Sequence, residues 1–132
     1  MGSQLTWRAW NLVGLTVSRI QIDRQIHLEI QAPDCALTLS FQSECYLQIA
    51  NRIRHTLITN QPDTLAPLLP VLHQPLVRFM VSTSGHCKLL LANSTVIWAD
   101  PAAGQPTWIS RGEGSLGSAS IQGEARPLVR QR

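Results

Sequence analysis

Few residue patterns in this chain have the spacing that a known reaction requires, and the first is a run of glycines. Residues 112–117 match the GxGxxG pattern of a dinucleotide-binding loop. Such a loop needs a strand before it and a helix after it, so that the helix N-terminus meets the pyrophosphate. Residues 118–123 are poor helix formers, and we expect too little chain after them for a nucleotide-binding unit. We therefore interpret this segment as part of a flexible tail.

Histidine and cysteine side chains are the next candidates, as metal ligands or nucleophiles. His27 and Glu29 form an HxE pair, but the zinc deaminases that use this pair also need a PCxxC segment, which the sequence lacks. His86 and Cys87 are adjacent, so a strand would send their side chains to opposite faces. Cys87 alternates with apolar residues, and we expect it in the core. The sequence thus predicts no catalytic residue, no metal site, no cofactor and no enzymatic activity.

The charge of the chain is basic but dispersed. Eleven Lys and Arg residues and eight Asp and Glu residues give a net charge of +3. Nucleic-acid-binding proteins usually concentrate their cations, and here the one local excess is Arg126, Arg130 and Arg132. The sequence shows no ladder of aromatic residues between the cations on which bases could stack. Nucleic-acid binding is therefore an alternative that we do not favour.

Alternation of apolar and polar residues with period two dominates the chain and predicts a β-rich α+β domain of about seven strands. The predicted strands are 17–22, 26–31, 37–42, 46–50, 76–81, 87–91 and 95–99, with a last short strand at 107–111. One short helix is expected at about 63–72, with Asp63 as its N-cap. Pro70 and Pro75 limit its length.

The order of these elements divides the chain into two similar halves, at about 12–50 and 72–111. Residues 17–22 align with 76–81, with an arginine at the same place, residues 28–30 align with 89–91, and residues 37–41 align with 94–98. Each half is expected to be an antiparallel three-stranded meander, and the linking helix separates them. A sandwich and a half-barrel both stay open, as does a true internal duplication. Residues 1–114 would form one domain, and 115–132 a tail rich in glycine and serine.

The apolar spacing over residues 12–114 also carries a family resemblance. The residues that carry it are Leu12, Val13, Gly14 and Val17 at the entry to the first meander and Leu68 and Leu69 in the predicted helix. The others are the paired strands 89–91 and 96–98, and Trp108, Gly112 and Gly114 in and after the last strand. This pattern resembles an uncharacterised bacterial family of small two-repeat β-meander proteins, some of which are similar to toxin-neutralising immunity proteins. The resemblance implies a fold of two meanders and a non-catalytic, partner-binding role.

A binding role also fits the composition, because only 14% of the residues are charged. We expect a protein-binding or interaction module of the bacterial cytoplasm, either similar to immunity proteins or a subunit of an assembly. Tryptophan and arginine dominate many binding interfaces. The predicted partner-binding patch exposes at least two of four residues: Trp98, Trp108, Arg78 and Arg111. Its partner would be another protein, a second copy in a homo-oligomer, or both, since sheet edges need to be covered.

Two other function classes stay open at this point. A small ligand-binding or enzymatic β-barrel would have a pocket lined by Arg19, His27 and Arg78, and a nucleic-acid-associated module would bind through its cations. A membrane protein is not expected, because no apolar run approaches the ~20 residues of a membrane span. Residues 1–10 lack the apolar region of a signal peptide, and three cysteines cannot all pair, which predicts a cytoplasmic protein with free thiols.

Overall fold

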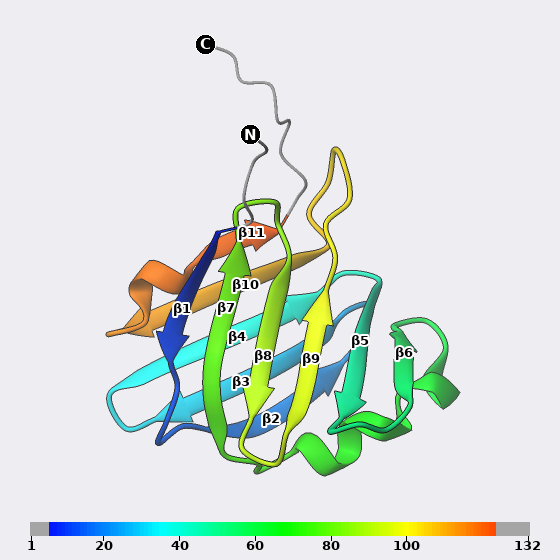
Figure 1. Ribbon diagram of the computed structural model, residues 1–132, viewed down its shortest axis with the longest axis horizontal. Helices are drawn as coiled ribbons and strands as arrows, with labels where there is room; N and C mark the ends of the chain where they lie inside the picture. Colours follow the sequence, from blue (N-terminus) through cyan, green and yellow to red (C-terminus); the bar gives the residue numbers. More distant parts are fainter. Residues whose placement is uncertain (1–5, 124–132) are drawn as a thin grey trace.

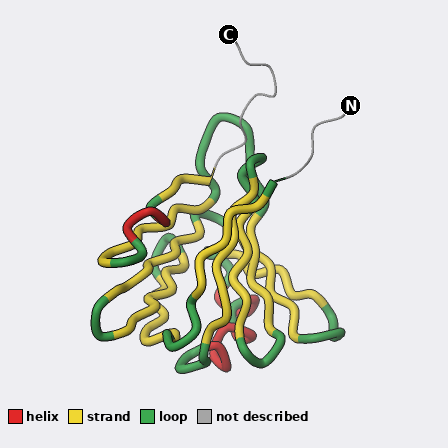
Figure 2. Tube along the Cα trace, turned by 60° about the vertical axis from the view of Figure 1, so that its left-hand side comes forward, coloured by secondary structure: helices red, strands yellow, loops and turns green. Residues whose placement is uncertain are grey.

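The computed structural model describes residues 6–123 and folds them into two antiparallel β-sheets packed face to face (Figure 1, Figure 2). The six-stranded sheet has the order β1-β7-β8-β9-β5-β6, and the five-stranded sheet has the order β11-β10-β4-β3-β2. The strands are β1 (Trp7–Asn11), β2 (Thr16–Ile22), β3 (Ile26–Ala32), β4 (Cys35–Phe41), β5 (Glu44–Ile49), β6 (Arg54–Ile58), β7 (Leu76–Ser82), β8 (Cys87–Leu91), β9 (Thr95–Ala99), β10 (Trp108–Gly114) and β11 (Ile121–Gly123). Strands of one sheet cross those of the other steeply (Figure 1). The predicted β-rich fold of two antiparallel meanders is confirmed, and over residues 6–123 it is an open sandwich.

The space between the sheets is filled by the apolar side chains that alternate along the strands. Leu28 pairs with Leu39 across β3 and β4, while Leu47, Ile97 and Leu89 form a continuous row across β5, β9 and β8. All five side chains are fully buried. Because burying one such side chain contributes about 1.5–3 kcal/mol, this packed interior is the main source of stability.

The two halves of the chain exchange their last hairpins. β2, β3 and β4 form a meander in the five-stranded sheet, but the β5–β6 hairpin that follows joins β9 in the other sheet. β7, β8 and β9 form the second meander, and the β10–β11 hairpin that follows crosses back to β4. Each sheet is therefore a meander from one half completed by a hairpin from the other, with β1 added beside β7.

The first strands of the two meanders agree in detail. A β-bulge interrupts the pairing between Val17 and Arg19 on β2, and another interrupts it between Leu76 and Arg78 on β7. The two arginines that the alignment placed together therefore each follow a bulge at the start of a meander. The halves share topology and local register here, while a duplicated origin stays a prediction.

The third strands of the two meanders show that part of the alignment is wrong by one residue. Leu39 pairs with Leu28, and Ile97 pairs with the equivalent Leu89, so Leu39 corresponds to Ile97. The alignment of 37–41 with 94–98 instead matched Phe41 with Trp98. Since neighbouring residues of a strand point to opposite faces, a shift of one residue exchanges inward and outward side chains.

The linking segment is not the single helix that the sequence predicts. Two 3-10 turns take its place, Pro62–Thr64 and Ala66–Val71, and among the described residues no side chain caps either of them. Prolines lack the backbone N–H that an α-helix needs, and Pro70 lies inside the second turn. Leu68 and Val71 are nevertheless buried, so the segment packs against the end of the core. No helix within residues 6–123 is long and apolar enough to span a membrane.

The flexible tail predicted from residue 115 is also wrong for the part that the structure describes. β10 continues to Gly114, a 3-10 turn spans Gly117–Ala119, and β11 pairs back onto β10. The backbone N–H of Ile121 donates a hydrogen bond to Ser110 Oγ at 3.2 Å. Glycine and serine serve here to allow close packing, because a Cβ at position 112 would overlap the carbonyl group of Leu116. Residues 124–132 of the predicted tail lie outside the described residues.

Candidate functional site

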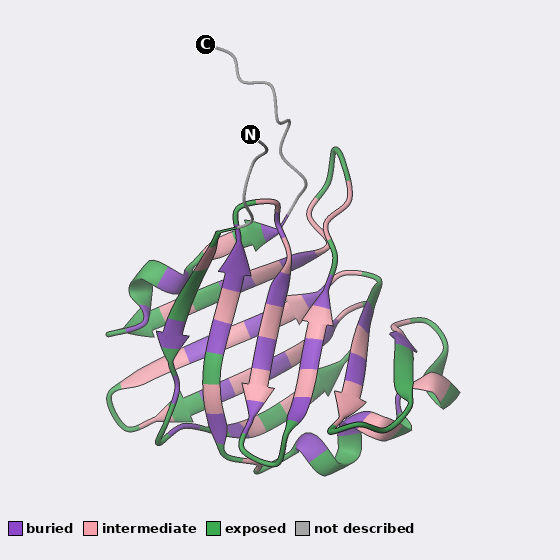
Figure 3. Cartoon of the chain, in the orientation of Figure 1, coloured by how far each residue is buried: buried purple, intermediate pink, exposed green. Residues whose placement is uncertain are grey.

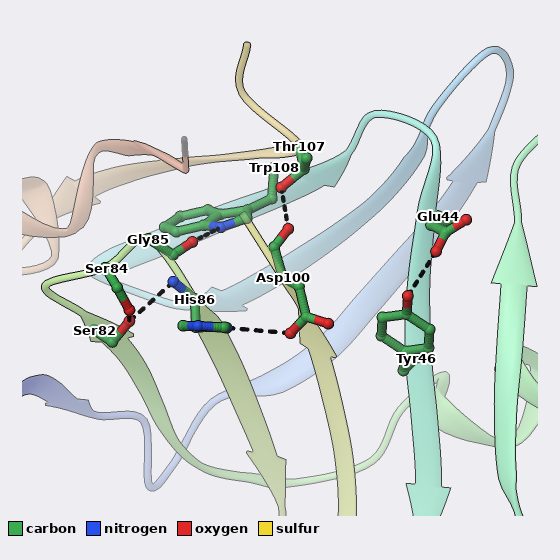
Figure 4. Close-up of polar contacts among 9 residues, drawn as sticks. All are labelled: Glu44, Tyr46, Ser82, Ser84, Gly85, His86, Asp100, Thr107 and Trp108. Carbon is green, nitrogen blue, oxygen red and sulfur yellow. Dashed lines mark hydrogen bonds and ion pairs between the residues drawn. The ribbon is translucent and has the colours of Figure 1, made fainter. Parts of the chain in front are cut away.

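The four residues of the predicted patch lie in three different places. Trp98 is half-buried on β9 and Arg78 is exposed on β7, both on the outward side of the six-stranded sheet. Arg111 is exposed on the outward side of the five-stranded sheet. Trp108 is fully buried in the core, where its Nε1 donates a hydrogen bond to the Gly85 carbonyl at 2.8 Å (Figure 4). The four therefore do not form one patch, and only Trp98 and Arg78 share a surface.

The outward side of the six-stranded sheet is the candidate functional site, and we call it the Trp98 face. Residues paired across neighbouring strands point to the same side of a sheet. Half-buried residues alternate with buried ones along β7, β8, β9 and β5 (Figure 3). The side chains that define the Trp98 face are Trp7, Tyr46, Gln48, Arg54, Arg78, Met80, Lys88, Leu90, Val96 and Trp98, with Glu44 and Asp100 at one end.

Aromatic and cationic side chains interleave across the Trp98 face. The Lys88 Nζ lies 5.1 Å from the ring centre of Trp7. Trp98 and Tyr46 have ring centres 5.5 Å apart, and the Arg54 Cζ lies 5.2 Å from the ring centre of Tyr46. The expectation that no aromatic residues interleave with the cations is therefore wrong for this face. The five residues come from five strands, so the row exists only after folding.

Charges on the Trp98 face are separated along the strand direction. Arg78 and Arg54 lie level with Gln48, at one end of the face. Glu44 begins β5 at the opposite end, and Asp100 directly follows β9 at the same level. All four charged side chains belong to exposed residues. The face therefore has a basic end, an acidic end, and a middle of aromatic and apolar side chains with Lys88 among them.

The ionisation of Tyr46 is sensitive to the acidic end of the face, because its hydroxyl donates a hydrogen bond to Glu44 Oε2 at 2.6 Å (Figure 4). This hydrogen bond, together with some burial, raises the pKa of Tyr46 to about 12. Tyr46 is the one tyrosine of the chain, so tyrosinate absorbance measures it directly. We expect ionisation near pH 12 in the native protein and, in Glu44→Gln, a midpoint shifted toward the ordinary value of about 10. Since the folded-state pKa is raised, the stabilisation from protonated Tyr46 is present below about pH 10 and is lost toward pH 12. An unchanged midpoint in the variant would show that the Glu44 carboxylate does not raise the pKa of Tyr46.

The outward side of the five-stranded sheet has a different composition. Seven of the eight side chains in its two central rows are polar, and the eighth is Ile109. One row is Arg19, Glu29, Thr38 and Arg111, and the next is Gln21, His27, Ser40 and Ile109. A hollow of about 270 Å³ lies on this side, lined in part by His27 and Arg111. Arg78 lies on the Trp98 face instead, so the pocket expected between Arg19, His27 and Arg78 does not form.

Asp23, His27 and Ser40 form a chain of polar contacts on this second side. His27 Nδ1 lies 2.7 Å from Ser40 Oγ, and its Nε2 lies 3.2 Å from Asp23 Oδ1. The backbone N–H of Gln25 donates to Asp23 and, with His27, holds the pKa of that carboxyl below its usual value. These residue types occur in hydrolases, but nucleophilic catalysis also needs donors for an oxyanion. β3 and β4 pair on both sides, which commits their backbone N–H groups to the sheet. We therefore interpret the chain of contacts as structural.

The cysteines are placed as small apolar residues. Cys45 and Cys87 are buried, and this burial raises the pKa of both thiols. The predicted core position of Cys87 is confirmed. Cys35 is free and half-buried. Within residues 6–123 no group of three or more potential metal-ligating side chains is found.

The chain was compared with known proteins by sequence and by structure. No protein-family model, no curated protein and no solved structure matches it. The resemblance to a family of bacterial two-repeat proteins therefore stays a prediction.

Proposed function

We propose that this chain is a non-catalytic protein-binding module of the bacterial cytoplasm and that its partner docks on the Trp98 face. The observation that carries the proposal is the difference between the two outward sides of the sandwich. In its central rows, one carries Gln, Ser, Thr, His and charged residues with a single apolar residue, Ile109, as a solvated sheet face normally does. The other presents tryptophan, tyrosine, methionine and branched apolar side chains with cations among them.

The composition of the Trp98 face matches the core of a protein interface. Aromatic residues, Met and Arg are enriched at such interfaces, whereas Lys, Glu and Asp are depleted. Trp98 and Tyr46 lie together at the centre, and Met80 lies in the same cross-strand row. Contiguous apolar patches on the surface of a small domain usually mark a binding site. A docked partner would remove this apolar area from water.

Single-stranded nucleic acid is a second candidate, because the interleaved aromatic rings and cations of the Trp98 face are also typical of base-stacking surfaces. Two contacts favour a protein. Lys88 already lies over the Trp7 ring and Arg54 over the Tyr46 ring, so a base would have to displace a cation in order to stack. The acidic end of the face would also repel a phosphate backbone.

A photoreactive amino acid placed at Leu90, on the Trp98 face, tests the proposal inside bacterial cells. The matched control is the same substitution at Thr38, which is half-buried in the middle of a strand on the opposite side. We expect discrete protease-sensitive adducts from position 90 and few from position 38. Nuclease-sensitive adducts would favour the nucleic-acid candidate, and equal labelling at both positions would contradict the proposed site.

A further inference from the structure

The charge distribution of the Trp98 face indicates what its partner is. Arg54 pairs with Gln48, and Glu44 begins the same strand four residues earlier. At about 3.3 Å per residue, the basic and acidic ends are therefore about 13 Å apart. Arg78 adds to the basic end and Asp100 to the acidic end, so each end carries two charges of one sign. Lys88 lies between the two ends, over the Trp7 ring, and is the third cation of the face.

A second copy of the same face complements the two charged ends when its strands are reversed. Such a pair has a two-fold axis that lies in the plane of the interface, runs perpendicular to the strands and is level with Trp98. This symmetry places the basic end of one copy over the acidic end of the other. The aromatic middles then meet each other. Strands that ran in the same direction would instead place arginine over arginine and carboxylate over carboxylate. Self-complementarity of one patch is what an isologous dimer requires.

We infer that the Trp98 face pairs with the Trp98 face of a second copy of this chain, with strands reversed and with Arg54 of each copy facing Glu44 of the other. The inference rests on the proposed function, that this face is a binding surface. β6 and β5 are neighbours in the sheet, so these two side chains differ sideways by one strand spacing, about 4.8 Å, which a long arginine spans. A polyanion would match only the basic end, whereas a second copy matches both ends.

The size of the face predicts a weak dimer. Six strands at about 4.8 Å spacing give a width of about 24 Å, and five residues along a strand give about 16 Å. The flat area of about 400 Å² is half of the roughly 800 Å² that each partner buries in a standard interface. We therefore expect association that depends on concentration in the micromolar range.

Charge reversal with exchange tests the inference on the purified full chain by analytical ultracentrifugation. Glu44→Arg and Arg54→Glu should each weaken self-association at least about tenfold, because like charges then face each other across the interface. Mixing the two single variants should restore association, since every Arg54 and Glu44 position then faces an opposite charge. The chain that carries both substitutions should also self-associate like the native protein. Within one copy the two residues are too far apart to compensate, so rescue requires contact between copies.

Control variants and the cross-linking result distinguish a failure of the inferred dimer from a failure of the proposed protein-binding function. Glu29→Arg and Arg111→Glu, on the opposite side of the sandwich, should leave association unchanged, and circular dichroism should show all variants folded. The chain could stay monomeric at millimolar concentration while position 90 still forms protein adducts in cells. That result would overturn the inferred dimer and leave the proposed protein-binding function standing. A dimer that is insensitive to charge reversal on the Trp98 face, with no adducts from position 90, would overturn both.

Discussion

Trp108→Ala is expected to lower the free energy of unfolding by about 3–5 kcal/mol, as removal of a large buried aromatic side chain usually does. Trp108 is fully buried and packs edge to face against Phe79 with ring centres 6.1 Å apart. Its Nε1 donates a hydrogen bond to the carbonyl of Gly85, and the alanine variant would remove this donor. Gly123 lies so close that a Cβ there would overlap the indole ring. Alanine would therefore leave both a cavity and an unpaired buried acceptor.

Trp98→Ala is the matched control, because it removes the same side chain from the outward face of the other sheet. Trp98 is half-buried and contacts Tyr46, so we expect a loss of about 1 kcal/mol or less. Urea denaturation followed by circular dichroism measures both variants, at protein concentrations too low for self-association. Equal losses in the two variants would show that the positions of the two tryptophans in the sandwich are wrong.

The different positions of Trp98 and Trp108 show how far alternation can be read from the sequence. Alternation locates strands well, and the central strands of both meanders lie where the pattern predicts them. It does not say which of two neighbouring residues points inward when both are apolar, as Ile97 and Trp98 are. That choice depends on the register with neighbouring strands. Cross-strand pairing with Leu47 and Leu89 directs Ile97 into the core and Trp98 outward.

The Trp98 face could be predicted only in part, for a related reason. Trp98 and Arg78 could be selected as binding residues by type, and they share this face. The interleaved row could not be found, since Trp7 lies on β1 and Arg54 on β6. Neither segment has a clear alternating pattern. β1 pairs with the distant β7, while β6 pairs with the preceding β5, which in turn joins the sheet beside β9. The order of strands in the sheet, which the sequence does not show, brings these residues together.

The exchanged hairpins also predict that neither half of the chain folds alone. We expect fragments 1–60 and 61–132, cut in the exposed turn after β6, to show no cooperative unfolding separately. In the first fragment, β4 lacks β10, and the inward faces of β3 and β4 lack the central strands β7, β8 and β9 of the opposing sheet. In the second fragment, β9 lacks β5 in the same way. The buried rows through Leu39 and Ile97 would be exposed to water in each case.

Mixing the two fragments should restore the fold, because each supplies the hairpin and the opposing meander that the other lacks. Circular dichroism and size-exclusion chromatography would show a β-rich one-to-one complex with a cooperative thermal transition. A third fragment, 61–106, which ends before β10 and β11, is the control and should not complement 1–60. It leaves β4 without its neighbour and removes Trp108 from the core. Folding of either half as a monomer would contradict the argument, since it would mean that one meander is stable without the hairpin from the other half.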